Sequence, residues 1–356
     1  MQDIVKQISE RIQQNAANKT PLAIHAGNSK AFYGGPVHGD VLDMRAYNGI
    51  VDYEPKELVL TVRAGTPLTE IEATLAQQKQ MLPFEPPHFG AAPNIATIGG
   101  TVATGLSGPR RPYTGAVRDF VLGTRILNGR GEDMHFGGRV IKNVAGYDVS
   151  RLMTGAMGTL GVLLDISFKV LPLPTAEATL RFELDEAGAI QRVNEWSGQP
   201  LPISASSWFE NALHLRLSGA ASGVKAAREK LGGELLNDDT ARNFWRELRD
   251  QRAAFFQTDL PLWRVSLPAT TAPLNLLMPQ WIEWGGALRW LRGNVDTKAI
   301  RDKVAALGGH VTLFKNGDKA VGVFHPLPPK LAEIHRNLKA AFDPADILNR
   351  RRMDNV

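Results

Sequence analysis

Glycines and hydroxyl side chains are concentrated in one segment of the chain, residues 94–173. Its densest part, Thr97–Gly108, holds four glycines and four serines or threonines within twelve residues. Glycine permits positive φ and lets a bulky ligand approach the main chain closely. Ile98, Val102 and Leu106 recur through this part, which favours a packed segment over a flexible linker. The composition therefore predicts a wall around a flat, phosphorylated ligand.

A second glycine-rich turn, Ala26–Gly35, follows a short apolar run at 22–26. Consecutive backbone N–H groups in such a turn can form an anion-binding nest, and Ser29 and Lys30 add a hydroxyl group and a cation. A plain turn is the alternative interpretation. The turn fits neither the G-x-x-x-x-G-K-[ST] phosphate loop nor the G-x-G-x-x-G fingerprint. A nucleotide bound here would therefore be held in a different way.

The elements that must position these residues follow an α+β order. Ile4, Ile8 and Ile12 predict an amphipathic helix over residues 3–17. Thr66 as N-cap and Pro67 at the first helical position predict a second helix over 67–79. Runs of apolar and β-branched residues predict strands at 22–26, 58–62, 120–122, 125–127 and 162–170, with a hairpin turn at 128–131.

The second half of the chain contains a weak internal repeat. Residues 213–236 and 287–313 each read as strand, helix, Gly-Gly and strand. Two such copies predict a ferredoxin-like α+β domain, with helices on one face of an antiparallel sheet. Pro172 and Pro174 mark the expected boundary before it. We expect domains at 1–174 and 175–325, and a C-terminal segment, 326–356, whose helix near 329–341 packs back on the first domain.

The composition excludes several classes of chemistry. The 356-residue chain has no cysteine, which excludes disulfides, a thiolate nucleophile and an iron–sulfur cluster held by this chain alone. Its net charge is +5, without a basic stripe interleaved with aromatic residues, so a nucleic-acid partner is not expected. The sequence shows neither a transmembrane run nor a signal peptide, and a cytoplasmic location is expected.

The motifs taken in order resemble the FAD-binding domain of the vanillyl-alcohol oxidase / p-cresol methylhydroxylase flavoprotein superfamily. Within it, the chain resembles the FAD-binding subunits of bacterial glycolate oxidases over nearly its whole length. The set is specific, whereas any single motif would be weak. Besides the two glycine clusters, it consists of Tyr113–Gly115, Asn128–Gly131, Lys142–Asp148, Gly158–Val162, Trp284–Trp290 and Phe342–Asn349.

The resemblance implies FAD as cofactor and assigns binding roles to three groups of residues. The first turn would hold the pyrophosphate through Ala26, Gly27, Asn28, Ser29, Lys30 and Ala31. The glycine-rich wall would line the dinucleotide through Thr97, Ile98, Gly99, Gly100, Ala103, Thr104, Ser107, Gly108, Tyr113 and Gly115. Main-chain contacts on the far side would come from Gly158, Gly161 and Val162.

Two departures from the family pattern limit what the resemblance implies. Some relatives attach FAD covalently through a histidine in the first turn; Asn28 stands there in this chain, so the FAD is expected to be non-covalent. His25 precedes the turn and is interpreted as a packed strand residue. Catalytic relatives that oxidise 2-hydroxy acids also carry clustered histidines that bind a metal. The histidines in the second half of this chain stand apart from one another in the sequence, so neither catalytic nor metal-binding residues are expected. They are His214, His310, His325 and His335.

Three functions remain open from the sequence. The first is an electron-relaying FAD subunit of a glycolate oxidase complex, with a catalytic flavoprotein subunit and an iron–sulfur subunit as partners. Those partners could also hold it at the inner face of the membrane. The second is a stand-alone FAD-dependent oxidoreductase, and the third is a non-catalytic scaffold. Trp281, Trp284 and Trp290 are interpreted as core or interface residues, with a role at the flavin as the alternative; Arg289 could hold a carboxylate or the flavin edge.

Overall fold

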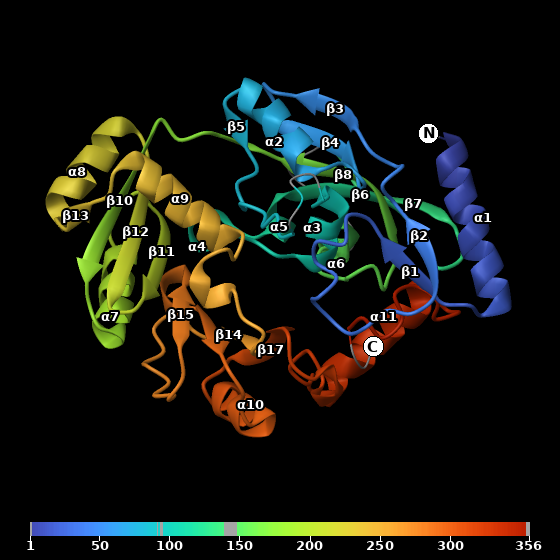
Figure 1. The fold of residues 1–356 in the computed structure, drawn as a ribbon. Helices are drawn as coiled ribbons and strands as arrows, with labels where there is room; N and C mark the ends of the chain where they lie inside the picture. The colour runs from blue at the N-terminus through green and yellow to red at the C-terminus, as the bar shows by residue number, and fades with distance from the viewer. Residues whose placement is uncertain (1, 91, 93–94, 139–147, 354–356) are drawn as a thin grey trace.

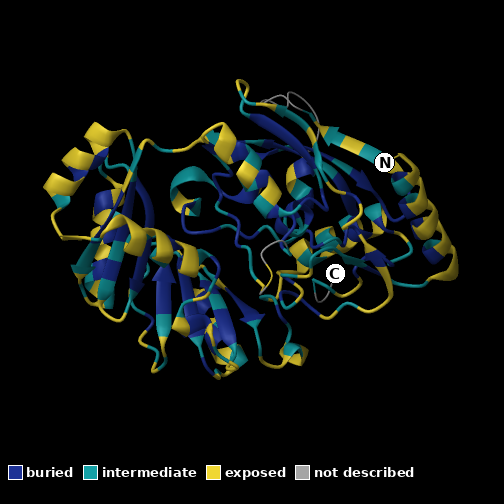
Figure 2. Cartoon of the chain, turned by 45° about the horizontal axis from the view of Figure 1, so that its top comes forward, coloured by how far each residue is buried: buried dark blue, intermediate teal, exposed yellow. Residues whose placement is uncertain are grey.

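The computed structural model describes residues 2–90, 92, 95–138 and 148–353. The motif residues Asn94 and 142–147 lie outside this range. The described chain forms a five-stranded sheet in its first part and an eight-stranded sheet in its second (Figure 1). Buried residues follow the strands of both sheets, while exposed residues lie mainly on the helices and loops (Figure 2). This mixed α/β architecture confirms the predicted class.

The first part is built on an antiparallel sheet in the order β3-β4-β8-β6-β7. A separate parallel pair, β1–β2, precedes it and leads into the glycine turn. The expected helix at 3–17 is α1, with Val5, Ile8 and Ile12 buried. The elements are α1 (Gln2–Asn18), β1 (Leu22–His25), β2 (Asp40–Asp43), β3 (Ile50–Glu54), β4 (Val59–Arg63), α2 (Leu68–Gln77), β5 (Gln80–Met81), α4 (Arg111–Thr114), α5 (Val117–Phe120), β6 (Val121–Leu127), β7 (Asp133–Gly137), α6 (Val149–Met153), β8 (Val162–Lys169) and β9 (Leu171–Pro172).

Thr66 does not cap the second helix as the sequence predicted. Its hydroxyl donates to the carbonyl of Arg63 at 2.7 Å and accepts from the backbone N–H of Gly49 at 2.9 Å. The helix, α2, begins at Leu68, and Pro67 occupies the cap position without a side-chain hydrogen bond. The hydroxyl is therefore used to tie two loops of the sheet together.

The glycine-rich wall folds as a short helix, α3 (Ile98–Thr104). The Thr97 hydroxyl accepts from the backbone N–H of Gly100 at its start, and Gly105 ends it with φ of 63°. A Cβ on Gly99 would lie 2.7 Å from the Cβ of Ala64, so this glycine lets the helix pack directly against the end of β4. The packed character of the segment was predicted from sequence, whereas its helical form was not.

The second part is an eight-stranded antiparallel sheet in the order β13-β10-β12-β11-β15-β16-β14-β17. The strands of the first predicted copy, β12 and β13, flank β10, and those of the second, β16 and β17, flank β14. The two halves of the sheet join where β11 pairs with β15. The elements are β10 (Ala176–Glu183), α7 (Glu186–Ser197), β11 (Ile203–Phe209), β12 (Ala212–Gly219), α8 (Ala221–Leu231), β13 (Glu234–Leu235), α9 (Asp238–Arg249), β14 (Leu262–Ser266), β15 (Gln280–Glu283), β16 (Leu288–Arg292), α10 (Thr297–Ala306) and β17 (His310–Lys315).

The helices of this sheet do not all lie on one face. Helices α7, α8 and α10 pack on one face through residues such as Val193, Val224 and Val304. Helix α9 contributes Trp245 and Leu248 to the cluster on the opposite face. The prediction of helices on a single face was therefore wrong for α9, because that face must also be covered where it meets the first part of the chain.

The two parts meet through an aromatic cluster. Tyr33 and Leu106 from the first part pack there with the three tryptophans Trp281, Trp284 and Trp290, all of which are buried. The indole N–H of Trp284 donates to the carbonyl of Gly108 at 3.1 Å. These contacts support the interpretation of the tryptophans as core and interface residues.

A charged network lies beside this cluster. The carboxylate of Glu85 accepts from the guanidinium groups of Arg110 at 3.3 Å and Arg216 at 2.9 Å. Both arginine side chains are 7% exposed, and Glu85 is 18% exposed. Arg110 also reaches Glu177 at 2.6 Å. Because Arg216 lies on β12 and Glu85 in the first part, the network joins the two sheets.

The C-terminal segment returns to the first part of the chain. Helix α11 (Pro329–Phe342) lies near β1–β2 (Figure 1). The Lys339 ammonium donates to the carbonyl of Thr159 at 3.0 Å and to Asp343 at 2.6 Å. Leu348 then forms a parallel bridge with Leu22. The tail is therefore placed beside the strand that leads into the glycine turn.

Candidate cofactor site

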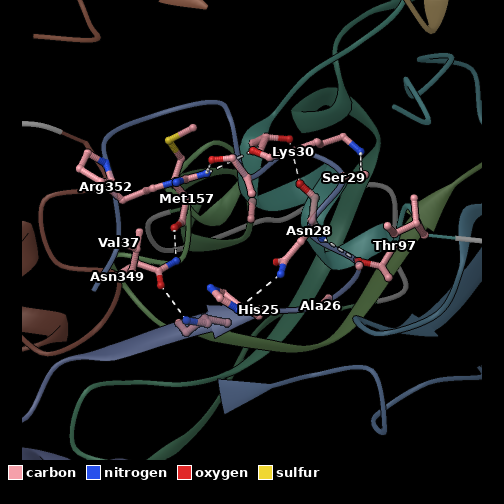
Figure 3. A pocket seen from close by; sticks show the side chains of 18 of the residues that line it. His25, Ala26, Asn28, Ser29, Lys30, Val37, Thr97, Met157, Asn349 and Arg352 are labelled. Carbon is pink, nitrogen blue, oxygen red and sulfur yellow. Dashed lines mark hydrogen bonds between the residues drawn. The ribbon is translucent and has the colours of Figure 1, made fainter. Parts of the chain in front are cut away.

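The glycine turn and helix α3 form neighbouring walls of a cavity of about 380 Å³ (Figure 3). The turn follows β1, and the C-terminal tail closes the third side. Many of the residues assigned from sequence line this cavity, namely Ala26, Gly27, Asn28, Ser29, Lys30, Ala31, Thr97, Gly100, Ala103 and Thr104. It is also lined by Ile24, His25, Pro36, Val37, Ile95, Met157, Lys319, Asn349 and Arg352.

The turn presents unpaired backbone donors to the cavity. Within the described ranges, no hydrogen-bond acceptor is recorded for the backbone N–H groups of residues 27–30. Asn28 has φ of 56°, in the left-handed region that non-glycine residues adopt at a cost. A Cβ on Gly27 would lie 1.3 Å from the carbonyl oxygen of Ile95, so only glycine fits there. The backbone is therefore arranged as an anion-binding nest.

Lys30 adds a buried cation to this nest. The residue is 5% exposed, its ammonium lies 3.4 Å from the Ser29 hydroxyl, and it forms no ion pair with any residue that the structure describes. Burial lowers the pKa of Lys30 to about 8, against an opposing effect of the Asp250 carboxylate. A buried ammonium without a counter-ion fits an anionic group of the ligand. The donor set thus suits the pyrophosphate of a dinucleotide.

The C-terminal tail holds the turn in place. The guanidinium of Arg352 donates to the carbonyls of Lys30 at 3.2 Å, Ala31 at 3.1 Å and Gly35 at 2.9 Å. Asn349 accepts from the N–H of Ile24 at 2.8 Å and donates to the carbonyl of Met157 at 2.7 Å. The contacts of Arg352 join residues that are more than 300 positions apart in the sequence. No local sequence motif predicts these contacts.

We expect Arg352→Ala to weaken FAD binding by roughly tenfold, because the turn would lose the charged donor that fixes its carbonyls. Titration of the apoprotein with FAD, followed by quenching of flavin fluorescence, measures the change. Arg351→Ala is the control, because Arg351 is exposed and does not line the cavity. Equal FAD affinity in Arg352→Ala and wild type would show that the tail does not position the turn.

Another set of assigned residues lies outside the lining of this cavity. Ile98 and Gly99 are buried against the core. The Ser107 hydroxyl accepts from the N–H of Val117 at 3.1 Å. Tyr113 lies beside Ser206 and Ser197, and burial raises the pKa of its phenol. Gly108, described above, holds Trp284, while Gly115 turns the chain with φ of 119°.

The far-side glycines are occupied by protein contacts. A Cβ on Gly158 would lie 2.6 Å from the side-chain amide of Asn349, and one on Gly161 would lie 3.0 Å from the carbonyl oxygen of Leu127. Val162 is fully buried in β8. The FAD-binding role of both groups outside the cavity stays a prediction. In the structure these residues pack within the first part, and Gly108 and Tyr113 also contact the second part.

Lys319 reaches the site through the turn that follows β17. After β17, Asn316 and Gly317 reverse the chain with positive φ, but a short 3-10 helix (Lys319–Val321) follows instead of a strand. The Lys319 ammonium donates to the carbonyls of Phe32 and Gly34, both at 2.8 Å. A second residue from the distant half of the chain therefore fixes the first turn.

Arg289 makes its contacts within its own domain. Its fully buried guanidinium donates to the carbonyls of Thr271, Ala272 at 2.9 Å and Gly286 at 3.2 Å. Its guanidinium also lies 3.7 Å from the carboxylate of Glu186, so its contacts are within its own domain, and a role toward a ligand carboxylate or the flavin stays a prediction. His214 stacks on Phe244 with ring centroids 4.2 Å apart, and burial lowers its pKa to about 4, so it is a packed residue.

Glu283 is a buried group that the sequence did not single out. It ends β15 beside the aromatic cluster and accepts from the indole N–H of Trp290 at 2.7 Å. Burial raises its pKa to about 7, partly offset by that hydrogen bond and by Arg264. Across the described ranges, no three histidine or acidic side chains converge as a metal site would require.

The comparisons with known proteins agree with this geometry. Residues 4–137 match the FAD binding domain family. The chain is 50% identical to glycolate oxidase subunit GlcE of Escherichia coli over 351 residues, which cover 99% of this chain and 97% of that protein. The chain belongs to the GlcE family. The chain is therefore an FAD-dependent oxidoreductase of this family, and FAD is its cofactor.

Two further similarities concern part of the sequence and the whole fold. Glycolate oxidase subunit GlcD of Bacillus subtilis is 31% identical over 142 residues, which cover 40% of this chain and 29% of that protein. The solved structure of p-cresol methylhydroxylase with substrate bound gives a TM-score of 0.71 at 16% identity, covering 98% of this chain and 87% of that one. This likeness shows the fold, as the sequence motifs predicted. None of the described helices is both long and apolar enough to span a bilayer.

Proposed function

We propose that the chain is the non-covalent FAD-binding subunit of a glycolate oxidase complex. In this proposal it relays electrons from 2-hydroxy-acid oxidation in a catalytic flavoprotein subunit toward an iron–sulfur subunit. The names of the GlcE and GlcD relatives, both glycolate oxidase subunits, support assembly into such a complex. The cysteine-free sequence supports a separate iron–sulfur partner. Contact with the membrane would come through the partners.

The observation that carries the proposal is the buried ammonium of Lys30 beside the backbone donors of residues 27–30. This ammonium contacts the Ser29 hydroxyl and the Phe89 ring and has no counter-ion among the described residues. A buried cation without a counter-ion is costly unless an anion completes the site. Bound FAD would supply one- and two-electron redox chemistry. The residues of the chain bind and orient it: the turn meets its pyrophosphate, and Arg352 and Lys319 keep the turn in shape.

Non-covalent attachment is the feature that separates this chain from covalent relatives. Contrary to its interpretation as a packed strand residue, His25 lines the cavity, with Nδ1 3.5 Å from the Asn28 amide. We expect acid precipitation of the purified protein to release its flavin completely, and chromatography to identify the released compound as FAD. Flavin absorbance that stays with the precipitate would contradict this expectation and point to His25. Protein purified without flavin near stoichiometry would instead favour the scaffold function.

Glu283 favours a second candidate function, turnover of a substrate by this subunit alone. A buried carboxyl with a pKa near 7 has the value that a general acid or base needs at neutral pH. It lies on the face of the second sheet that meets the first part, close to Arg264. Anaerobic addition of glycolate to the isolated chain separates the two functions, because only the second predicts bleaching of the flavin without a partner.

A further inference from the structure

Exposed apolar side chains gather on the segment that leads into α11. Of the eleven large apolar side chains that are exposed in the described ranges, four lie within residues 321–334. We name these four the α11 face: Val321 at 42%, Leu327 at 38%, Leu331 at 41% and Ile334 at 54% exposed. Scattered exposed apolar residues need no explanation, whereas a cluster indicates an interaction site.

The α11 face continues a stripe that is buried elsewhere on the same helix. Leu338 and Phe342 pack against the core of the first part. Leu331 is seven residues before Leu338, so it lies on the same side of the helix two turns earlier. Neither Leu331 nor Ile334 belongs to a core cluster of the described chain. The stripe therefore runs beyond the edge of the domain and lacks a partner there.

The α11 face borders a hollow of about 710 Å³ with a basic lining. Val321 and Leu327 line this hollow together with Ala332. Its charged and titratable residues are Tyr33, Arg264, Arg301, His310, His325, His335 and Arg336, with no aspartate or glutamate among the lining residues. Glu333 lies on the same helix but does not line the hollow. The hollow therefore complements an acidic segment.

We propose that the α11 face is the docking surface for the catalytic, GlcD-type flavoprotein subunit, which presents apolar side chains flanked by carboxylates. This inference rests on the proposed function, because the occupant is a subunit of the same complex. An exposed apolar face beside a hollow lined by Arg264, Arg301 and Arg336 suits a protein segment that carries both apolar and acidic side chains. A membrane fits less well, because no tryptophan or phenylalanine is among the large apolar side chains exposed in the described ranges, and such side chains anchor interfacial helices.

The test uses the full chain with an affinity tag, co-expressed with the catalytic, GlcD-type flavoprotein subunit. The double variant Leu331→Asp/Ile334→Asp should retain at least tenfold less partner, because each aspartate removes an apolar contact and repels the acidic segment. The control is Leu235→Asp/Leu277→Asp, which changes two exposed leucines of the second sheet and its loops, at 47% and 109% exposure. Both double variants should keep the wild-type flavin content and Tm.

Partner retention at the wild-type level by Leu331→Asp/Ile334→Asp would overturn the inference while leaving the proposed complex intact. If the wild type itself retained no partner, both the inference and the proposed function would fall. A third arm measures sedimentation with phosphatidylglycerol vesicles. Vesicle binding that the α11 variant loses while it keeps its partner would assign the face to a membrane and would also overturn the docking proposal.

Discussion

Lys30→Met is expected to weaken FAD binding by about 10- to 100-fold, so that the purified variant is largely colourless. The substitution keeps the length of the side chain but removes the charge next to the proposed pyrophosphate site. Hydrogen bonds to a charged group contribute about 1.5–3 kcal/mol. The apoprotein should not be destabilised, because the ammonium is buried without an ion pair in the described structure and methionine suffers no such desolvation. Fluorescence titration with FAD and a thermal melt measure the two effects.

The affinity for FAD should also depend on pH through Lys30. Its pKa is lowered to about 8 in the protein without ligand. A bound anion favours the charged form, so the affinity should be highest below pH 8 and fall as pH rises above it. Below pH 8 the lowered pKa of Lys30 reduces the stability of the apoprotein. This reduction should become smaller as pH rises from 8 to the ordinary lysine pKa near 10.5.

Two further variants test whether the charge of Lys30 causes the effects on FAD affinity and its pH dependence. Lys30→Arg should keep a positive charge at all these pH values and flatten the dependence, whereas Lys225→Met changes an exposed lysine and should behave as wild type. A Lys30→Met protein that binds FAD with wild-type affinity and wild-type pH dependence would remove the main support for the proposed pyrophosphate site.

Glu85→Ala is expected to lower the free energy of unfolding by about 3–5 kcal/mol, because it removes the carboxylate partner of Arg216 and one of the two carboxylate partners of Arg110 where the two sheets meet. The loss should appear as a fall in Tm of several degrees. Glu177→Ala removes a partner of Arg110 that is 43% exposed, and it should cost less than about 1 kcal/mol. Calorimetry on both variants gives the comparison, and equal melting of Glu85→Ala and wild type would refute the role of the network.

The same network predicts sensitivity to acid. Although burial raises the pKa of Glu85, the guanidinium groups of Arg216 and Arg110 more than compensate and hold it below its ordinary value. A depressed pKa contributes stability above the ordinary carboxyl pKa, and this stability is lost as pH falls through the depressed value. The wild type should therefore lose more stability than Glu85→Ala on acidification below about pH 4.5.

The sequence predicted the elements whose pattern is local. The spacing of Ile8 and Ile12 in α1 and the apolar runs of β4 and β8 reflect burial against one core, and the structure confirms them. Helix α3 was missed because its glycines and threonines have low helix propensity. It forms because Gly99 packs against Ala64 and the Thr97 side chain caps it. Tertiary packing therefore overrides propensity at the wall of the site.

The candidate site was predictable on one side only. The Ala26–Ala31 turn and Thr97 could be found from glycine and hydroxyl spacing, and both line the cavity. Lys319, Asn349 and Arg352 could not, because each acts through backbone carbonyls or amides about 300 residues away in sequence. Glu283 was likewise hidden, since its raised pKa depends on burial that only the assembled sheets create.

Anaerobic reduction by glycolate is the most direct test of the proposed electron relay. The isolated holoprotein is mixed with glycolate without oxygen, and its flavin absorbance is followed with and without the catalytic flavoprotein subunit. The relay predicts that the flavin of this chain stays oxidised alone and is reduced once the partner is present. Reduction of the flavin in the isolated chain would contradict the relay and assign substrate oxidation to this subunit itself.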